Sequence, residues 1–402
     1  MNAPPLKGDH RLLKNINRIA LLHLLREEEG LSRAELADRS GLTRSTVSLL
    51  VKALIDEGWL REDEVPVTGQ LGRRPTPLQL DGQRFVLVGA ELTPDTIRVV
   101  ATSIRGELLE VDQVALRQLD PEGACRQLVD RVSVLVRRVV DRGREVLGIG
   151  VGLPGVVDPQ TGMLQFAPNI GWRNVPVGQR LREELESAGL AAIPVHYQNE
   201  GDLAAIGETE FGPRPAADPL VYISCGVGLG SGIVLGGKLF VGATGAGGEI
   251  GHNILQPRGR ACECGRRGCA ETYVGLRAIA ADAGLAPPLD REALKAALVA
   301  GDPRARAAFH EAGASLGVLL QNIWATFDPH SIVVGGEAVA LGGSHFIDAA
   351  LRELAGHADA AGLPAPDVRL ARYTELAVAV GGAAYTLYLM MQPFHALQQQ
   401  QR

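Results

Sequence analysis

Three of the five cysteines in this 402-residue chain lie within eight positions, at Cys262, Cys264 and Cys269, and His252 precedes them by ten residues. Structural zinc takes four thiolate or imidazole ligands in a tetrahedron, so a closed set of this kind leaves no position open for water. Cysteines separated by one residue pair poorly with each other as a disulfide. The spacing therefore predicts one structural Zn²⁺ that folds residues 252–269 around itself. The alternative is three free thiols in a loop and a histidine with other partners.

The length of the chain favours two or three domains, because single cores rarely grow past about 250–300 residues. Hydrophobic residues make up 46% and charged residues 21%, which places the chain among globular proteins. The formal net charge of −6 argues against a surface coated in basic residues for nonspecific nucleic-acid binding. Residues 1–84 hold thirteen Lys and Arg against twelve Asp and Glu, whereas the remainder holds 27 against 34. Any DNA contact is therefore local and belongs to the first segment.

The first 60 residues have the pattern of a small helical module. Apolar residues recur at helical spacing over residues 10–28, which predicts a first helix. Ser32 and Glu35 have the spacing of a capping box, so a short second helix begins there. Gly41 turns the chain into a third helix, which begins near Thr43 and ends before a strand pattern.

The third helix and the segment after it carry the side chains that a major groove requires. Short hydroxyl side chains let a helix approach base edges, and an arginine can donate two hydrogen bonds to guanine. Two short strands, at residues 59–61 and 77–80, enclose a basic loop and predict a wing whose arginines reach phosphates or the narrow groove. We expect DNA contacts from Ser32, Arg33, Thr43, Arg44, Ser45, Thr46, Ser48, Arg73 and Arg74. The alternative is a three-helix bundle that binds proteins.

From residue 84 onward, strand patterns alternate with helix patterns. Strands are predicted at residues 85–92, 96–103, 107–114, 146–151 and 194–198, with an amphipathic helix at residues 123–142. The second half repeats the plan, with strands at residues 220–225, 231–235, 238–241 and 331–334 and helices within residues 274–327. Two similar α/β lobes with a cleft between them follow, although no repeat is visible in the sequence itself.

One long pattern of residues resembles the ROK family, whose members are repressors, open reading frames and kinases. Residues 248–252 read Gly-Glu-Ile-Gly-His, and residues 262–271 read Cys-Glu-Cys-Gly-Arg-Arg-Gly-Cys-Ala-Glu. Further matches are Gly-Leu-Pro-Gly-Val-Val-Asp at residues 152–158, Asn-Ile-Gly-Trp at 169–172, Asn199-Glu200, and Asp328-Pro329 leading to Gly335-Gly336. The resemblance covers essentially the whole chain.

The resemblance implies an α/β chain with an N-terminal winged helix-turn-helix and an actin-like, ribonuclease-H-like two-lobed sugar-kinase fold, assembled as a homodimer or a dimer of dimers. The DNA-binding domain is expected at residues 1–82. The first lobe is expected at residues 83–198, with a C-terminal helix at 378–392 packing back onto it. The second lobe, with the zinc loop, is expected at residues 199–377.

The resemblance also implies which residues form the sites. It places the zinc ligands on His252, Cys262, Cys264 and Cys269, and the sugar contacts on Asn169, Asn199, Glu200, Glu249, His252 and Glu271. Carboxylates and amides offer paired acceptors and donors to neighbouring hydroxyls. A cleft of this kind discriminates sugars, because a missing hydroxyl leaves buried polar groups unpaired.

The phosphate-binding elements of the family's kinases are altered in this chain. Those kinases have an Asp-x-Gly-Gly-Thr turn after the first strand, whose amides cradle phosphate. Residues 91–95 here read Glu-Leu-Thr-Pro-Asp, where Pro94 lacks an amide and Asp95 repels phosphate. The family's Gly-Thr-Gly element reads Gly-Val-Gly at residues 226–228, and Glu200 stands where a catalytic aspartate is usual. The sequence predicts sugar binding without catalysis.

We therefore expect a sugar-responsive repressor of carbohydrate-metabolism genes, which binds operator DNA. The resemblance implies that sugar binding releases the DNA. Asn199-Glu200 resembles the xylose-repressor branch, so xylose or a related free aldose is the expected effector. Two alternatives stay open: a kinase that phosphorylates a hexose or N-acetylhexosamine with ATP, and a repressor that responds to a protein partner. The sequence shows no apolar leader and no stretch long enough to span a bilayer, so we expect a cytoplasmic protein without membrane contact.

Overall fold

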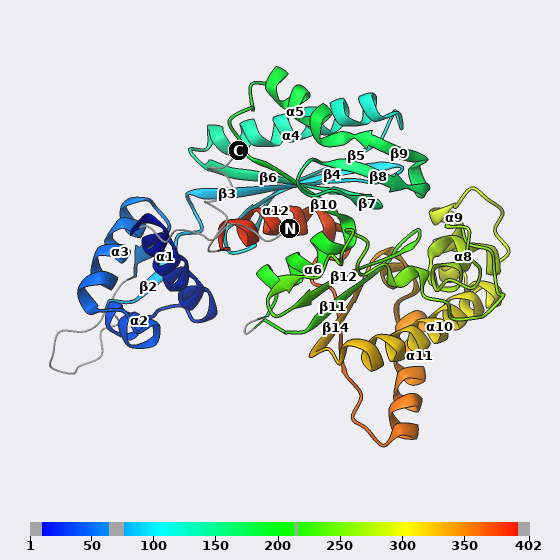
Figure 1. Cartoon of the computed structure of the whole chain (residues 1–402). Coiled ribbons are helices and arrows are strands. Elements are labelled where there is room, and N and C mark those ends of the chain that lie inside the picture. The colour runs from blue at the N-terminus through cyan, green and yellow to red at the C-terminus, as the bar shows by residue number, and fades with distance from the viewer. Residues whose placement is uncertain (1–9, 64–75, 214–215, 393–402) are drawn as a thin grey trace.

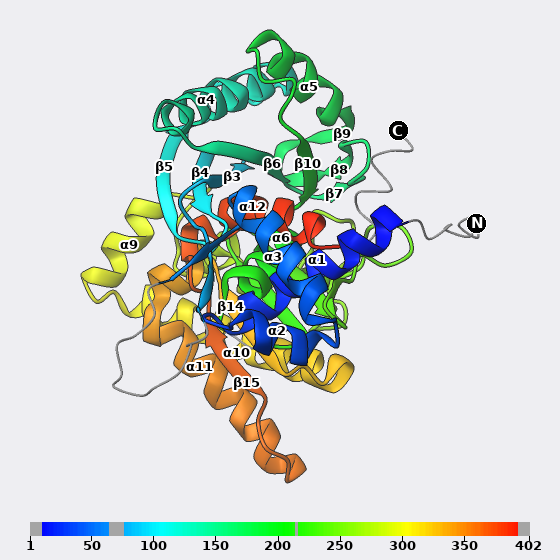
Figure 2. The same cartoon turned by 90° about the vertical axis from the view of Figure 1, so that its left-hand side faces the viewer.

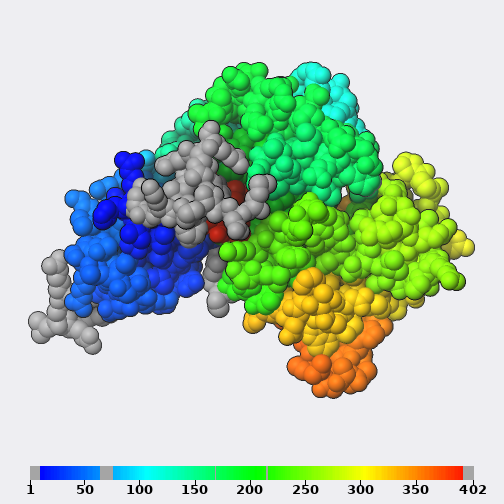
Figure 3. Space-filling model, viewed as in Figure 1, coloured from blue at the N-terminus to red at the C-terminus, as the bar shows by residue number. Residues whose placement is uncertain are grey.

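The computed structural model describes residues 10–63, 76–213 and 216–392, which form a small N-terminal unit and a larger two-lobed body (Figure 1). The small unit contains α1 (His10–Glu27), α2 (Arg33–Ser40) and α3 (Arg44–Asp56). Its strands β1 (Leu60–Glu62) and β2 (Leu78–Leu80) pair antiparallel. This arrangement is a winged helix-turn-helix, as the sequence predicted. The space-filling view shows it on the left, beside the two lobes (Figure 3).

Local hydrogen bonds fix both ends of α2 and the start of α3. The Ser32 hydroxyl accepts from the Glu35 amide at 3.3 Å, and the Glu35 carboxylate accepts from the Ser32 amide at 2.8 Å, which completes the predicted capping box. Gly41 ends α2 at a φ of 69°, which glycine adopts without steric strain. Thr43 begins α3 by accepting from the Thr46 amide at 3.2 Å. Each of these features is a consequence of local sequence.

The first lobe is a five-stranded sheet whose outer face is covered by two helices. Figure 1 shows α4 (Pro121–Asp141) and α5 (Val177–Ser187) on that face. The strands lie in the order β10-β6-β3-β4-β5. Their bounds are β3 Phe85–Leu92, β4 Thr96–Ser103, β5 Leu108–Ala115, β6 Glu145–Leu153 and β10 Val195–Asn199.

A small second sheet extends the first lobe. It consists of β7 (Val156–Val157), β8 (Met163–Ala167) and β9 (Trp172–Pro176), paired antiparallel. The sequence pattern did not predict these strands. Alternation is recognisable over runs of about four to eight residues, and strands of two to five residues barely reach that length.

The second lobe is built on another five-stranded sheet, in the order β13-β12-β11-β14-β15. Its strands are β11 Leu220–Cys225, β12 Leu229–Leu235, β13 Lys238–Leu239, β14 Ser331–Gly335 and β15 Asp367–Leu370. Its helices outside the lobe interface are α7 Glu271–Val274, α8 Leu276–Asp282, α9 Arg291–Val299, α10 Pro303–Phe327 and α11 Glu337–Ala361. None of the helices in the described part of the chain is long and apolar enough to cross a bilayer.

The two sheets share one topology. In each, the first three strands form an antiparallel meander, and the fourth and fifth are added in parallel on the other side of the first. Both sheets therefore have the order 3-2-1-4-5. The repeat is a property of the fold, and it explains why two lobes of similar shape arise without visible sequence repetition.

Helices α6 (Glu200–Phe211) and α12 (Ala377–Met390) lie between the two sheets (Figure 1). A Cβ atom on Gly89 of β3 would stand 1.7 Å from the carbonyl oxygen of Ala379 in α12. Glycine at this position lets the helix backbone lie directly on the sheet. The C-terminal helix thus packs on the first sheet, although the whole second lobe precedes it in sequence.

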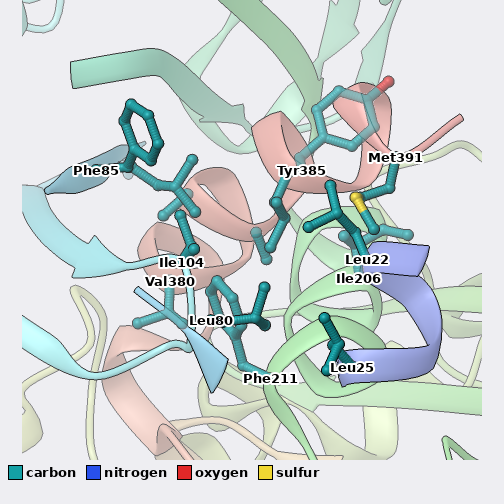
Figure 4. Close-up of a cluster of buried hydrophobic side chains, with 14 of the residues drawn as sticks. Leu22, Leu25, Leu80, Phe85, Ile104, Ile206, Phe211, Val380, Tyr385 and Met391 are labelled. Carbon is teal, nitrogen blue, oxygen red and sulfur yellow. The ribbon is translucent and has the colours of Figure 1, made fainter. Parts of the chain in front are cut away.

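A continuous apolar cluster joins the winged helix to the body. Leu22 and Leu25 of α1 belong to the same buried cluster as Ile206 and Phe211 of α6 (Figure 4). Met391, directly after α12, belongs to it too. Figure 2, which views the molecule from the side of the winged helix, shows α1 and α3 in front of α6 and α12. Helix α6 therefore begins between the lobes and ends against α1.

Candidate functional site

The four candidate metal ligands come together in one loop region. His252 belongs to a short 3₁₀ turn, Ile250–His252, and the three cysteines lie in the loop that leads into α7. One ligand atom from each of the four residues lies within 4.8 Å of all the others. The Cys262 Sγ atom stands 3.7 Å from Nδ1 of His252, and the Sγ atoms of Cys264 and Cys269 are also 3.7 Å apart.

These distances fit a tetrahedral metal. Two thiolates that bind one zinc ion at about 2.3 Å lie about 3.8 Å apart when the angle between them is tetrahedral. The 3.7 Å separation of Cys264 and Cys269 matches this value. Cysteine and histidine are also the donor set that zinc prefers. The other ring nitrogen of His252, Nε2, faces Glu249 Oε2 at 3.9 Å, outside the cysteine cluster.

A cavity of about 390 Å³ runs between the lobes, beside the cysteine loop. All six residues that the resemblance assigned to a sugar line it: Asn169, Asn199, Glu200, Glu249, His252 and Glu271. They come from the 3₁₀ turn Pro168–Ile170, the end of β10, the start of α6, the turn at His252 and the start of α7. The fold therefore brings together residues more than 100 positions apart. The volume lies within the range of small-molecule sites.

Asn199 is mainly a structural residue within this set. Its Oδ1 accepts from the Gly201 amide at 2.7 Å and thereby caps α6, while its Nδ2 donates to the Gly155 carbonyl at 2.8 Å. The side-chain amide has two N–H groups, so one remains for a ligand. The expected sugar contact at Asn199 is thus limited to one donor, and its larger effect is to hold Glu200 at the first position of α6.

Glu200 lies among other carboxylates at the base of the cavity. Burial, together with the negative charges of Glu91, Glu249 and Glu271, raises the pKa of Glu200 to about 8. Arg98 partly neutralises the group, because its guanidinium pairs with Glu91 at 3.0 Å. A protonated Glu200 can donate as well as accept a hydrogen bond, which suits recognition of a hydroxyl.

Glu271 links the cavity to the cysteine loop. Its Oε2 accepts from the Leu229 amide at 3.3 Å, and its Oε1 lies 3.7 Å from Cys262 Sγ. A Cβ on Gly228 would stand 2.3 Å from Oε2, so a glycine there leaves room for the carboxylate. The need to make room for Glu271 is thus enough to explain the glycine at position 228, and no role in phosphate binding has to be assumed.

Sequence reasoning missed Arg277 of α8. Its Nη1 donates to Asn169 Oδ1 of the other lobe at 3.4 Å and pairs with Glu263 at 3.2 Å. The contact orients Asn169 at the edge of the cavity. The only hint in the sequence is that Arg277 lies six residues after Glu271. Its partner Asn169 is 108 residues away, so no local pattern links the two residues.

Two turns that line the cavity have backbone amides already paired within the chain. In the β3–β4 turn, the Thr93 amide donates to the Thr96 carbonyl and the Thr96 amide donates to the Thr93 hydroxyl, both at 2.9 Å. Pro94 between them has no amide hydrogen. In the turn after β11, the Gly226 amide donates to the Gly228 carbonyl at 3.0 Å. These amides are already paired.

The glycine pair after β14 also has a packing role. A Cβ on Gly336 would stand 2.5 Å from the Cys225 carbonyl oxygen, and Gly336 has a φ of 96°. A Cβ on Gly335 would stand 2.5 Å from the hydroxyl of Tyr222. Close approach between β14 and β11 therefore accounts for both glycines.

The outer face of α3 presents the candidate DNA-contacting residues. Arg44, Ser45 and Ser48 are exposed there, and so is Lys52. Leu49 lies on the same face, with 72% of its surface exposed. The sequence prediction did not include Leu49 among the DNA contacts, because its side chain is apolar. Ser45 and Leu49 are four residues apart, which is the helical signal that could have placed Leu49 on this face.

Other predicted DNA contacts have partners within the chain. Ser32 is buried, and its hydroxyl both accepts from the Glu35 amide and donates to its carboxylate, so we correct its assignment from DNA contact to helix cap. Arg33 pairs with Glu62 of the wing at 2.6 Å. Thr43 caps α3, and its hydroxyl lies 2.8 Å from that of Thr46. Arg73 and Arg74 lie outside the described residues.

Comparison with known protein families gives two matches. A model described as the ROK family matches residues 88–388, which is most of the chain. A model described as winged helix-turn-helix DNA-binding matches residues 14–61. Together they cover both the small unit and the two-lobed body.

Two curated relatives align with most of the chain. The xylose repressor of Caldicellulosiruptor bescii is 28% identical over 354 residues, which cover 83% of this chain and 86% of that protein. The DNA-binding transcriptional dual regulator NagC of Escherichia coli K12 is 26% identical over 348 residues, which cover 82% of each chain.

Two solved structures have a similar fold. A ROK family transcriptional regulator, a homolog of the E. coli MLC protein, has a TM-score of 0.76 at 23% identity and covers 96% of this chain and 99% of its own. The ROK family glucokinase of Streptomyces griseus, in complex with glucose and AMPPNP, has a TM-score of 0.63 at 28% identity. It covers 75% of this chain and 98% of its own.

Proposed function

This chain belongs to the ROK family, and on that premise we propose that it is a transcription repressor that binds operator DNA through its winged helix and a free sugar between its lobes. The observation that carries the proposal is the cavity of about 390 Å³, which six polar side chains expected to contact a sugar line together. The same chain contains a winged helix joined to that body by a buried cluster. The two relatives described above are named as a repressor and a transcriptional regulator.

His252 Nδ1 and the thiolates of Cys262, Cys264 and Cys269 would hold the proposed Zn²⁺. When bound, the ion would supply a cross-link that stabilises the loop. With the loop fixed in this way, His252 presents Nε2 toward Glu249. Glu271, which follows the cysteine loop at the start of α7, remains directed into the cavity. The loop residues therefore orient the sugar-binding groups, so disruption of the loop weakens sugar binding as well as folding.

The proposed effector is xylose or a related free aldose. Glu200, Glu249 and Glu271 offer several carboxyl oxygens to adjacent hydroxyls, and Asn169 adds an amide. The Caldicellulosiruptor relative is named for xylose, which supports this choice. Other Escherichia coli relatives are named N-acetylglucosamine repressors, which makes this sugar the principal competitor in any binding panel.

Recognition of the operator is assigned to the outer face of α3. Arg44 donates to guanine, Ser45 and Ser48 bond to base edges or phosphates, and Leu49 packs on a thymine methyl group. Arg73 and Arg74 contribute wing contacts to the backbone. A homodimer reads two half-sites, and a sugar that changes the angle between the lobes changes the spacing of its winged helices and releases the DNA.

The main alternative function is that of a sugar kinase, because the Streptomyces griseus glucokinase has a similar fold. Catalysis of phosphoryl transfer requires free amides and positive charge around the phosphates. In this chain Asp95 lies at that end of the cavity, and the amides of Thr93 and Thr96 are bonded internally. These features support binding without transfer.

The test is a gel shift with the DNA upstream of the gene, with and without xylose, glucose, N-acetylglucosamine and N-acetylmannosamine. We expect one free sugar to release the DNA, and Arg44→Ala to lower discrimination between operator and random DNA. Lys295→Ala, an exposed change on α9 remote from the DNA-binding face, is the control. Operator binding that no sugar alters, with Glu249 and Glu271 dispensable, would instead support a protein effector.

A coupled ADP-release assay separates the repressor from the kinase. We expect no sugar-dependent release of ADP. Sugar-dependent turnover that Glu200→Gln abolishes would show that the chain is an enzyme.

A further inference from the structure

One arginine that lines the cavity, Arg291, joins the two lobes beside the β3–β4 turn. Arg291, the first residue of α9, donates from Nη1 to Asp95 Oδ2 of the β3–β4 turn at 2.7 Å. Its Nε pairs with Glu337, the first residue of α11, at 2.7 Å. All three residues line the same cavity as the sugar-binding groups. Asp95 belongs to the first lobe and the other two to the second.

The turn that carries Asp95 is held rigidly by its own hydrogen bonds. The Asp95 carboxylate accepts from the hydroxyls of Thr93 at 3.0 Å and Thr96 at 3.2 Å. Burial opposes the charge of Asp95, but the guanidinium of Arg291, together with the two hydroxyls, holds the pKa of Asp95 below its ordinary value. The carboxylate is therefore fixed in position, and Arg291 approaches it from the opposite lobe.

The charge of the cavity makes this end unsuitable for an anion. Eight Asp and Glu side chains line it, against two arginines, Arg98 and Arg291. Arg98 is paired with Glu91, and Arg291 lies between Asp95 and Glu337. A phosphate group entering here would have to displace Asp95 from Arg291 while it faced the remaining carboxylates at close range.

We propose that Asp95, Arg291 and Glu337 form an interlobe latch that closes the phosphate end of the cavity and restricts it to uncharged sugars. This inference rests on the proposed sugar-binding function. At the other end of the cavity, the Arg277–Asn169 contact also joins the lobes. A sugar bound between these two contacts favours the closed arrangement, so the latch contributes to sugar affinity without touching the sugar.

Binding of a neutral sugar provides the first test. D-xylose and D-glucose carry no charge, so salt dependence of their binding reports on ion pairs within the protein. For the wild type, we expect the calorimetric Kd to rise between 50 and 500 mM NaCl. Asp95→Asn is expected to raise Kd about fivefold at low salt, the upper range for a partly exposed ion pair, and to flatten the salt dependence.

Glu292→Gln is the matched control, because Glu292 is exposed beside Arg291 on the same helix. It removes one negative charge without touching the latch, so its Kd should equal that of the wild type. Equal Kd values and equal salt dependence for Asp95→Asn and the wild type would overturn the latch.

Anionic probes provide the second test. We expect neither inorganic phosphate nor D-glucose 6-phosphate to bind the wild type at millimolar concentration. The double variant Asp95→Asn/Glu337→Gln frees the Arg291 guanidinium and should gain measurable phosphate binding. Binding of the sugar phosphate to the wild type as tightly as free glucose would contradict the exclusion.

Hydrogen exchange separates failure of the latch from failure of the proposed function. If no sugar binds the wild type, the proposed function fails, yet the latch still predicts faster exchange of the α9 amides in Asp95→Asn than in Glu292→Gln. Equal exchange rates in the two variants would refute the latch, whatever the sugar results.

Discussion

The ion pair between Arg26 and Glu210 fixes the winged helix to the body, and its removal gives a quantitative test of that docking. Arg26 lies on α1 and Glu210 near the end of α6. The Nη2 atom of Arg26 stands 2.6 Å from Glu210 Oε2 and 2.8 Å from the Glu210 carbonyl oxygen. Their side chains are only 8% and 10% exposed, and Leu22, Leu25 and Phe211 belong to the adjoining cluster.

Glu210→Ala leaves the guanidinium buried with the carbonyl as its remaining partner. Removal of one member of a buried ion pair costs about 3–5 kcal/mol. Because one hydrogen bond survives, we expect a value near the lower end, roughly 3 kcal/mol. This is about a 100-fold increase in the opening equilibrium that exposes α1. The double variant Arg26→Met/Glu210→Leu should lie within about 1 kcal/mol of the wild type, since apolar replacement removes both charges.

Native-state hydrogen exchange of the α1 amides measures this opening directly. Glu57→Ala is the matched control, because Glu57 pairs with Arg18 of the same helix at a more exposed site and should change exchange less than about fivefold. Urea denaturation followed by Trp59, which contacts Phe85 at the junction, gives an independent measurement. The reasoning is refuted if Glu210→Ala resembles Glu57→Ala, or if the double variant is as labile as the single one.

Three further outcomes are expected. Cys264→Ser should reduce bound zinc from about one ion per chain to a small fraction and lower the Tm, whereas Cys125→Ala, a buried thiol outside the cluster, should keep the metal in elemental analysis. Because the pKa of Glu200 is raised from 4.5 to about 8, the folded chain keeps a proton that the unfolded chain releases, so stability falls as pH rises through this interval. Glu200→Gln should therefore raise the Tm at pH 8.5 and leave it unchanged at pH 4; an equal gain at both pH values would contradict the pKa. Gly228→Ala should weaken calorimetric sugar binding at least about tenfold while moving the Tm by less than about 2 °C, since the new Cβ clashes with the tip of the flexible Glu271 side chain and otherwise makes an ordinary contact with Asn169; unchanged affinity would remove Glu271 from the site.

Features that depend on neighbours in sequence were predictable from the residues. The capping box at Ser32, the turn at Gly41 and the grouping of Cys262, Cys264 and Cys269 require only local geometry, and the structure contains all of them. The strand at residues 85–92 was likewise predicted with its observed bounds, because β3 is an uninterrupted buried run. Short-range patterns report backbone conformation directly.

Features that depend on pairing across the fold were not predictable. Leu49 has a core residue's chemistry on an exposed face, and Asn199 is occupied by capping α6. Arg277 and Arg291 acquire their roles from partners on the other lobe. No pattern within a helix identifies a partner that the chain reaches after more than 100 residues.

The sequence by itself determined a winged helix, two α/β lobes and a cysteine–histidine cluster, because hydrophobic periodicity, caps and ligand spacing act over a few residues. Tertiary structure decided that the two sheets share one strand order and that Asp95 and Arg291 meet at the end of the cavity. It also decided that α6 joins the cavity to α1. The physical reason is that glycines at contact points such as Gly89 let helices and sheets approach closely, and this packing sets which distant side chains meet.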